Sequence, residues 1–328
     1  MLSAAVLAVV LLTASACNFM KPRQQEAASD QTSPEGVGTI ERLDPALHSL
    51  ATDRTQIQRI ITGYQQLDAP FYSREGYLLF NDVKKDTIRK WTPDGVIAEY
   101  RVPGGGAHCI TTDPQRQLVV CETANHRISW TNRAGTMRPR ADNVNNPQDA
   151  VFSADGTLYF TDLAPEGKKS GVYSADAEGN SKLLTTDLSR PSGIALSKDE
   201  KYLFVTNADP GRRVLMRFEV KKDGGIETGK VLFDFSSQTS PGVPGGVKLD
   251  VNDNLYVAGP GGIFVISADG KHLGTFKTPE QPTNLFWGKY ADTTTAPAMG
   301  SAEYATTLYI TGGGDVYRIG LTAVGVRP

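Results

Sequence analysis

Six positions that recur along the chain carry residue types able to do chemistry. Each opens a short unit in which Pro or Ala and a polar residue precede an apolar segment, a turn and a second apolar segment. The residues at these positions are Asp68, His108, Gln148, Ser192, Gly245 and Asn284. A carboxylate and an imidazole can exchange protons near neutral pH, while amide and hydroxyl oxygens can bind a ligand or a hard cation. Any such chemistry depends on whether the fold brings the six positions together.

The repeat that contains these positions predicts the fold. Its six copies recur about every 40–50 residues, which is the length of a four-stranded propeller blade. Hairpin signals such as Asp94-Gly95 and Asp269-Gly270 mark turns within the copies. We therefore expect an all-β, six-bladed β-propeller of four-stranded blades over residues 58–328, whose inner strands start at one face and ring the axis. The six positions then converge on one axial pocket, where polar groups commonly bind a ligand.

The ends of the repeat region predict how the ring closes. The sixth copy runs out of chain near Leu321 and lacks an outer strand of its own. We expect residues 58–62, just before the first copy, to supply that strand, because closing the ring removes exposed sheet edges. The same copy carries an insertion at residues 289–304, which we expect to be a surface loop at the rim or mouth of the pocket.

The N-terminal residues predict export. Residues 2–16 are uncharged and apolar, too few to span a bilayer comfortably, and end in small residues before Cys17. Residues 1–17 resemble a signal peptide with a bacterial lipobox that lipidates Cys17; plain secretion and an uncleaved anchor are the alternatives. We expect residues 18–42 to be a disordered tether and residues 43–57 a short helix. The predicted location is the cell envelope or periplasm, with the membrane reached only through the lipid.

The composition of the chain argues against two classes of partner. The formal net charge is −2 and there is no stripe of Lys and Arg, so a nucleic acid or an anionic membrane surface has little electrostatic attraction for the chain. We expect a monomer whose partner is a small molecule.

Cys109 and Cys121 remain once Cys17 is assigned to lipid. They lie on the two strands of one predicted hairpin and can be cross-strand neighbours. Because disulfides between paired strands are usually strained, two buried free thiols are favoured over a disulfide. No Cys/His spacing suggests a structural zinc ion.

Several segments resemble the family of senescence marker protein (regucalcin), gluconolactonase and luciferin-regenerating enzyme. They are Leu78-Leu79-Phe80-Asn81-Asp82, Leu158-Tyr159-Phe160-Thr161-Asp162, Arg190-Pro191-Ser192-Gly193-Ile194-Ala195 and Gly259-Pro260-Gly261-Gly262. The resemblance covers roughly residues 63–319, and the segments look like those of bacterial gluconolactonase-type members. It implies a six-bladed propeller that holds one divalent cation at its axis and hydrolyses sugar lactones or related esters.

The resemblance also implies four metal ligands, and this chain departs from all of them. Asp68 stands in place of a Glu, Gln148 and Ser192 in place of two Asn, and Gly245 in place of an Asp that is the family's natural general base. Affinity for a hard cation follows the number of carboxylate ligands. We therefore expect Ca²⁺, Mg²⁺, Mn²⁺ or Zn²⁺ to bind weakly or not at all.

Two functions remain open from the sequence. The first is an envelope-anchored, gluconolactonase-like hydrolase with an altered axial metal site, in which His108 and Asp68 act in catalysis. The second is a catalytically inactive propeller of the same family that binds a ligand or protein, which the missing side chain at Gly245 favours. His108 itself has three interpretations: a base or soft metal ligand, a hydrogen-bonding residue of a polar channel, or a ligand contact. Asp149 is interpreted as capping a turn.

Overall fold

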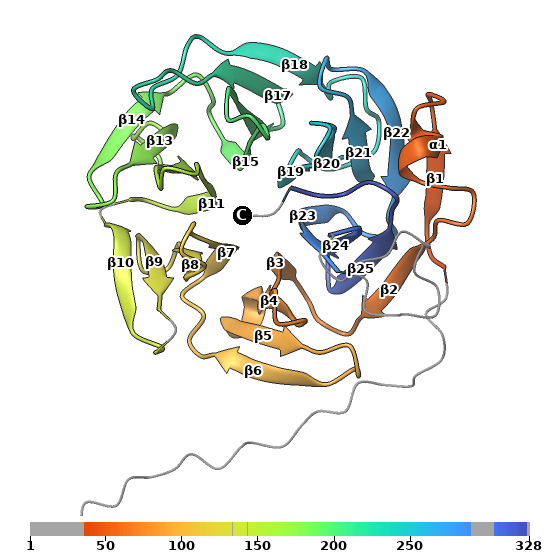
Figure 1. The fold of residues 1–328 in the computed structure, drawn as a ribbon, viewed down its shortest axis with the longest axis horizontal. Coiled ribbons are helices and arrows are strands. Elements are labelled where there is room, and N and C mark those ends of the chain that lie inside the picture. The colour runs from red at the N-terminus through yellow and green to blue at the C-terminus, as the bar shows by residue number, and fades with distance from the viewer. Residues whose placement is uncertain (1–35, 133, 143, 290–304, 327–328) are drawn as a thin grey trace, which may run out of the picture.

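The computed structural model describes residues 36–132, 134–142, 144–289 and 305–326. Its strands form six antiparallel sheets arranged as blades around a central axis (Figure 1). The prediction of an all-β, six-bladed propeller is confirmed. The signal peptide, Cys17, most of the tether and nearly all of the insertion lie outside the described residues.

Blades one to four are each made of consecutive strands, which run from the axis outward in chain order. Blade one contains β3 (Leu67–Tyr72), β4 (Leu78–Asp82), β5 (Thr87–Trp91) and β6 (Ile97–Arg101), with the short 3-10 helix η1 (Val83–Lys85) between β4 and β5. Blade two contains β7 (Ala107–Thr112), β8 (Leu118–Glu122), β9 (Arg127–Thr131) and β10 (Met137–Asp142). Blade three contains β11 (Pro147–Phe152), β12 (Leu158–Asp162), β13 (Gly171–Ala175) and β14 (Ser181–Thr185). Blade four contains β15 (Pro191–Leu196), β16 (Tyr202–Asp209), β17 (Arg212–Glu219) and β18 (Lys230–Asp234).

Blades five and six are completed by N-terminal strands. Blade five contains β19 (Val247–Leu249), β20 (Leu255–Gly259), β21 (Gly262–Ile266), β22 (His272–Lys277) and, outermost, β1 (Thr39–Arg42). Blade six contains β23 (Pro282–Gly288), β24 (Thr307–Gly312), β25 (Asp315–Gly320) and, outermost, β2 (Ile57–Ile61). The predicted closure of blade six by the segment before the first repeat is confirmed, because β2 pairs with β25.

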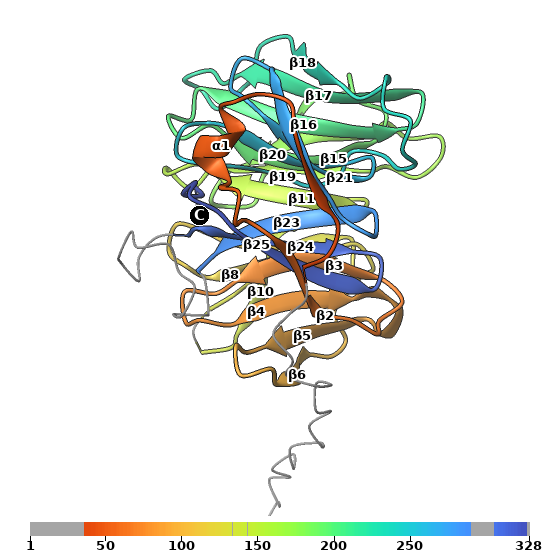
Figure 2. The ribbon, with the colours of Figure 1, turned by 90° about the vertical axis from the view of Figure 1, so that its right-hand side faces the viewer.

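Residues 39–57 differ from the sequence prediction in two ways. Residues 39–42, expected in the disordered tether, form β1, because their backbone pairs with β22 at the free edge of blade five. The helix expected over residues 43–57 is only α1 (Leu47–Leu50), which packs Leu47 and Leu50 into the core of blades five and six. Figure 2 shows α1 and both strands on the outer side of these blades. Within the described residues, no helix is long and apolar enough to cross a membrane.

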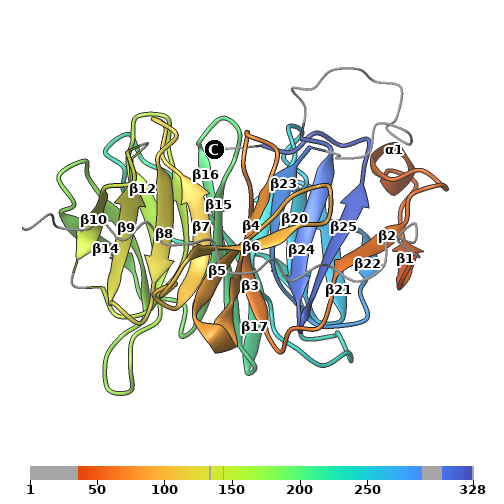
Figure 3. The same cartoon turned by 90° about the horizontal axis from the view of Figure 1, so that it is seen from below.

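The core lies between neighbouring blades. Viewed from the side, the strands run between the two faces of a disc (Figure 3), and their side chains alternate toward the blades on either side. Tyr72 of blade one stacks on Tyr309 of blade six with ring centroids 4.9 Å apart. Such fully buried aromatic contacts make the packing between blades as specific as that of a single-core domain.

Five of the six inner strands have a shift of register near their start, and only the β19–β20 ladder of blade five runs without one. In blade two the register moves from Ala107 opposite Glu122 to Cys109 opposite Cys121, so His108 between them has no partner in the ladder. Similar shifts occur near the start of the inner strands of blades one, three, four and six. A bulge of this kind aims a side chain away from the sheet and is common beside functional sites.

Hydrogen bonds join most blades near the axis. Thr161 Oγ1 donates to the Ser192 carbonyl, Thr206 Oγ1 to the Gly245 carbonyl at 2.6 Å, and Asn81 Nδ2 to the Ala107 carbonyl at 2.7 Å. Each donor side chain therefore ties its own blade to the next. In blade two the corresponding residue is Cys121, which is opposite Cys109 and forms a disulfide with it instead.

Candidate functional site

Matching residues near the start of the six inner strands make one set. Asp68, His108, Gln148, Ser192 and Gly245 are each partly exposed between buried neighbours; His108, Gln148 and Ser192 lie within register shifts, Asp68 lies directly before one, and Gly245 precedes β19. In blade six the matching residue is Thr283, because the ladder pairs Pro282 with Gly312 and Asn284 with Thr311 and skips Thr283.

The placement of Asn284 at the axis is therefore wrong by one residue. Asn284 is only 7 % exposed. Its Oδ1 accepts from the Leu285 N–H at 2.8 Å, and the side chain packs against the backbone of Gly246. Asn284 was predicted at the axial position because it is polar. The strand register, however, decides which side chain points away from the sheet, and it selects Thr283.

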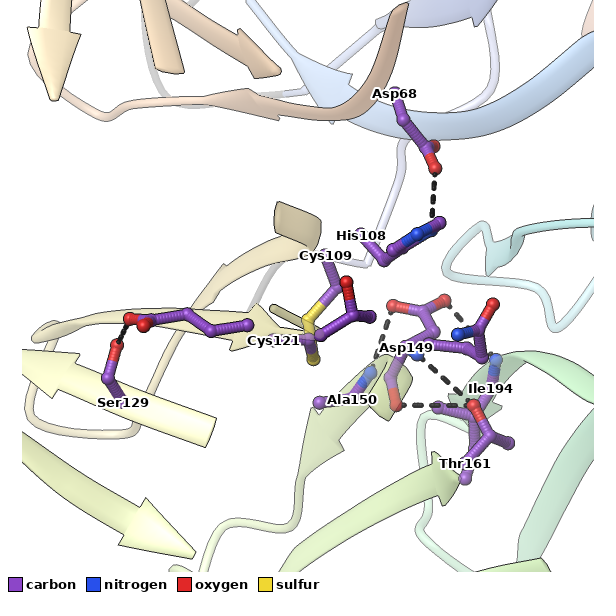
Figure 4. Close-up of a disulfide and its surroundings, with 12 residues drawn as sticks. Asp68, His108, Cys109, Cys121, Ser129, Asp149, Ala150, Thr161 and Ile194 are labelled. Atoms are coloured by element: carbon purple, nitrogen blue, oxygen red, sulfur yellow. Dashed lines mark hydrogen bonds and ion pairs between the residues drawn. A yellow bond between two sulfur atoms is a disulfide. The ribbon is translucent and has the colours of Figure 1, made fainter. Parts of the chain in front are cut away.

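The structure brings together the two predicted catalytic residues. His108 Nδ1 lies 3.1 Å from Asp68 Oδ2, across the junction of blades one and two. Asp68 Oδ1 accepts from the Ala69 N–H at 2.8 Å, which fixes the carboxylate. The imidazole is 35 % exposed and the carboxylate 14 %, so both side chains keep some solvent-accessible surface. Figure 4 shows the two side chains pointing toward one another.

Asp68 changes the pKa and the tautomer of the His108 imidazole. Burial favours the neutral ring, but the hydrogen bond and the negative charge of Asp68 together outweigh it and raise the pKa of His108 above its ordinary value. A carboxylate on Nδ1 places a proton on that nitrogen in the neutral tautomer and leaves Nε2 as the acceptor. This arrangement suits a general base.

Gln148 and Ser192 supply neutral polar groups rather than charges. Gln148 Nε2 donates to the Asn146 carbonyl at 2.9 Å, which orients the amide. The Ser192 backbone carbonyl accepts from Thr161, while its side chain remains partly exposed. Both side chains are partly exposed, and their amide and hydroxyl groups are able to bind hydroxyl groups of a ligand.

The disulfide between Cys109 and Cys121 corrects the prediction of two free thiols. The two residues are directly opposite each other in the β7–β8 ladder, with Cα atoms 5.0 Å apart, within the range that a disulfide spans. Both are buried. Cys109 follows His108 directly, so the bond ties the strand at the residue next to the imidazole (Figure 4).

The sequence interpretation missed a second charged pair, which joins Lys248 of blade five to Asp149 of blade three. Lys248 Nζ lies 3.1 Å from Asp149 Oδ2, and that oxygen also accepts from the Ile194 N–H at 3.3 Å. Burial raises the pKa of the Asp149 carboxyl, while Lys248 acts in the opposite direction. Asp149 does bond the following backbone N–H of Ala150, as a turn-capping role would, but it is also the partner of a cation. The available signal was a lysine between Val247 and Leu249 in an otherwise apolar inner strand.

Glu122 forms a third buried charged group, away from the bulged positions. Its carboxylate is fully buried and contacts Arg101 at 2.6 Å and Arg127 at 3.0 Å. Burial alone would raise the pKa of Glu122, but bonds from Ser129 and Asn125 and the charge of Arg101 hold it below its ordinary value. The network joins the end of blade one to blade two and has a structural role.

The donor set at the four positions where the resemblance implies metal ligands does not fit a hard divalent cation. Asp68 is the one carboxylate among them and is engaged with His108. A Cβ atom at Gly245 would lie 2.3 Å from the Thr283 carbonyl oxygen, so no ligand side chain could be accommodated there without movement. Within the described ranges, no three His, Cys, Asp or Glu side chains group as a metal site.

Comparison with known proteins agrees with this architecture. A family model described as the SMP-30/gluconolactonase/LRE-like region matches residues 68–312. The chain belongs to this family. Among curated relatives, a gluconolactonase of Zymomonas mobilis is 27 % identical over 330 residues, covering 89 % of this chain and 92 % of the relative. A lactonase drp35 of Staphylococcus epidermidis is 27 % identical over 232 residues, covering 65 % and 70 %.

Solved structures of this family share the fold. The gluconolactonase of Xanthomonas campestris superposes with a TM-score of 0.73 at 22 % identity, covering 93 % of this chain and all of that one. A regucalcin of Agrobacterium tumefaciens, described as a calcium-binding protein, has a TM-score of 0.67 at 15 % identity, covering 82 % and 94 %. At these identities the likeness concerns the propeller, and the chemistry has to be argued from the residues of this chain.

Proposed function

We propose that this protein hydrolyses sugar lactones or related esters, with His108 as a general base held by Asp68 in place of metal-based activation. The observation that carries the proposal is the 3.1 Å contact between His108 Nδ1 and Asp68 Oδ2 at the start of two adjacent inner strands. The lactonases among the curated relatives support the substrate class.

The reaction follows from the orientation of the imidazole. Asp68 holds the proton on Nδ1, so Nε2 accepts a proton from a water molecule as that water attacks the lactone carbonyl carbon. The carbonyl oxygen becomes an oxyanion in the tetrahedral intermediate. The ring C–O bond then breaks, and the departing ring oxygen takes the proton from Nε2, which yields a hydroxy acid and restores the neutral imidazole.

The pocket is suited to a neutral, hydroxyl-bearing substrate. Gln148, Ser192 and Thr283 present amide and hydroxyl groups at the bulged positions of blades three, four and six. Thr283 Oγ1 also donates to the Leu67 carbonyl at 3.2 Å, which holds blade six against blade one beside Asp68. Such convergent, neutral polar groups can distinguish a sugar lactone from an unsubstituted one.

Hydrolysis of δ-gluconolactone in the presence of a chelator tests the proposal. We expect turnover by the wild type that does not require an added divalent ion, and a loss of about 10²–10⁴-fold in kcat for His108→Ala. His48→Ala is the matched control, since His48 is exposed on α1 far from β7 in the chain. Activity that appears only with added Ca²⁺, Mg²⁺, Mn²⁺ or Zn²⁺, or that survives His108→Ala, would contradict the mechanism.

A binding role is the second candidate. Gly245 offers no side chain where the resemblance implies the family's general base, and the neighbouring Gly246 N–H is bonded to the Thr283 carbonyl at 3.0 Å. If no lactone is turned over under any condition but δ-gluconolactone or its hydroxy acid binds saturably, the pocket serves recognition rather than hydrolysis.

We also propose that the protein is exported and held at the cell envelope by lipid on Cys17. The disulfide between Cys109 and Cys121 supports this location, because disulfides persist in oxidising compartments such as the bacterial periplasm. Expression of the full chain in a bacterium fed with labelled palmitate should label the membrane fraction. Cys17→Ala should remove the label, and equal labelling of both forms would exclude this anchor.

A further inference from the structure

Lys248 is a cation in an unusual place. It lies three residues beyond Gly245, at a place where the other five inner strands have Phe71, Thr111, Val151, Ala195 and Phe286. Its ammonium contacts Asp149 of blade three although Lys248 belongs to blade five. The side chain therefore extends past blade four near the axis, since its partner oxygen is also bonded by the Ile194 N–H of that blade.

Blade five has also lost a charge of the opposite sign. Gly245 stands where the resemblance implies a carboxylate, and the same blade carries Lys248 three residues later. The position that corresponds to the family's carboxylate therefore carries no negative charge, while an ammonium lies on the same inner strand. A positive group that faces the reaction is what a lactone hydrolase needs when its carbonyl oxygen becomes negative.

A purely structural role explains this pair poorly. Taking two charges out of water costs free energy that their attraction only partly returns, so buried pairs are weak contributors to stability. The two partners also differ in exposure: the Asp149 side chain is 5 % exposed and that of Lys248 is 18 % exposed. The carboxylate is covered, while the lysine keeps solvent-accessible surface.

We propose that the Lys248 ammonium is the anion-binding group of the axial pocket, where it holds the lactone carbonyl oxygen as it becomes an oxyanion and then the carboxylate of the hydroxy-acid product. In the structure Asp149 pairs with the ammonium at 3.1 Å. An incoming anion shares or displaces that contact. This inference deepens the proposed function and rests on it for the catalytic step, but the binding of a hydroxy-acid carboxylate can be measured without turnover.

Calorimetric titration with D-gluconate tests the anion site directly. We expect wild type to bind gluconate, Lys248→Met to bind it at least about tenfold more weakly, and Lys248→Arg to retain much of the affinity because a cation is kept. Lys201→Met is the matched control: Lys201 is also paired with an aspartate, at 2.7 Å from Asp199, but on the surface. Absence of gluconate binding by wild type, or equal binding by Lys248→Met, would overturn the proposal.

Asp149→Asn separates anion binding from structural support. If Asp149 competes for the ammonium, removing its charge should strengthen gluconate binding several-fold. If the pair only braces blades three and five, the same change should lower the melting temperature and leave gluconate affinity unchanged or weaker, which would overturn the proposal. The Asn variant keeps the shape of the side chain, and circular dichroism establishes that each variant is folded before titration.

The two proposals fail separately. Gluconate binding that depends on Lys248 in a protein that hydrolyses no lactone would refute the proposed function and keep the anion site. Hydrolysis that depends on His108 but is unchanged in Lys248→Met would keep the proposed function and refute the anion site.

Discussion

In blade two, the bulge at the start of the inner strand presents His108 to the channel, and the Cys109–Cys121 disulfide ties the strand pair directly behind it. In blade five, the matching position is Gly245, whose carbonyl is bonded by Thr206 and whose Cα faces the Thr283 carbonyl too closely for a side chain. The two blades differ in backbone as well as in side chain: β7 has a register shift at His108, whereas the β19–β20 ladder has none and the Gly245 N–H donates to the Ala258 carbonyl at 2.8 Å. Position in the repeat therefore does not by itself determine chemistry.

Blade two also differs from blades three and four in how it is joined to the next blade. Blades three and four use a threonine hydroxyl to bond the next blade near the axis, through Thr161 and Thr206. Blade two has Cys121 at the equivalent position, and this residue forms a disulfide within its own blade. The inner end of blade two is therefore stabilised internally, beside the residue proposed to act as base.

Removal of the disulfide should have the largest effect on stability. For Cys109→Ala/Cys121→Ala we expect a loss of about 3 kcal/mol in the free energy of unfolding, since the bond closes a loop of 12 residues in sequence separation. Denaturant unfolding with and without a reducing agent measures it. Reduction should destabilise wild type and leave the variant unchanged; no effect of reductant on either would mean the thiols are free.

A second variant tests whether a threonine hydroxyl can join blade two to blade three, as Thr206 joins blade four to blade five. Cys109→Ala/Cys121→Thr places in blade two the residue that joins blade four to blade five. We expect it to recover about 1 kcal/mol relative to the double alanine variant, which is the typical net contribution of one hydrogen bond. Equal stability of the two variants would show that a hydroxyl at this position does not reach blade three.

Gly245→Ala should destabilise the protein through crowding, by no more than removal of the disulfide does. The new methyl group would meet the Thr283 carbonyl oxygen at 2.3 Å, so the backbone of blade five or six has to move, at about 1–3 kcal/mol. Gly211→Ala is the control, because Gly211 is exposed and its Cβ would have only ordinary contact with Asp209. For the same reason Gly245→Asp should not create a calcium site. A Gly245→Ala protein as stable as wild type would refute this account of the closed pocket.

The smallest expected effect is on the titration of His108. Asp68 raises the pKa of His108, so Asp68→Asn should lower it, and NMR titration of the ring protons measures the change. The ion pair is present below the ordinary pKa of histidine and is lost as pH rises through the raised pKa, so wild type should lose this stabilisation on going to alkaline pH. The base is the neutral ring, so hydrolysis should fall as pH drops through the same pKa. An unchanged His108 titration in Asp68→Asn would contradict the pairing.

The amino-acid sequence determined the blade number, the closure of blade six by an N-terminal strand and the meeting of Asp68 with His108. These follow from local patterns: a period of apolar strands, turn residues, and a polar residue at the start of each inner strand. The strand β1 was not predictable in this way, because residues 39–42 become a strand only when the free edge of β22 is present to pair with them.

Only the tertiary structure decided the remaining features of the pocket. The register of β23 places Thr283 rather than Asn284 at the bulge. Cys109 and Cys121 form a disulfide, although the strain that is usual between paired strands favoured free thiols. Lys248 and Asp149 are 99 residues apart in the chain, and their meeting depends on the curvature of the whole ring. Contacts near a propeller axis join residues from different repeats, so the sequence of each blade determines its own strands while the assembled ring determines which charges meet.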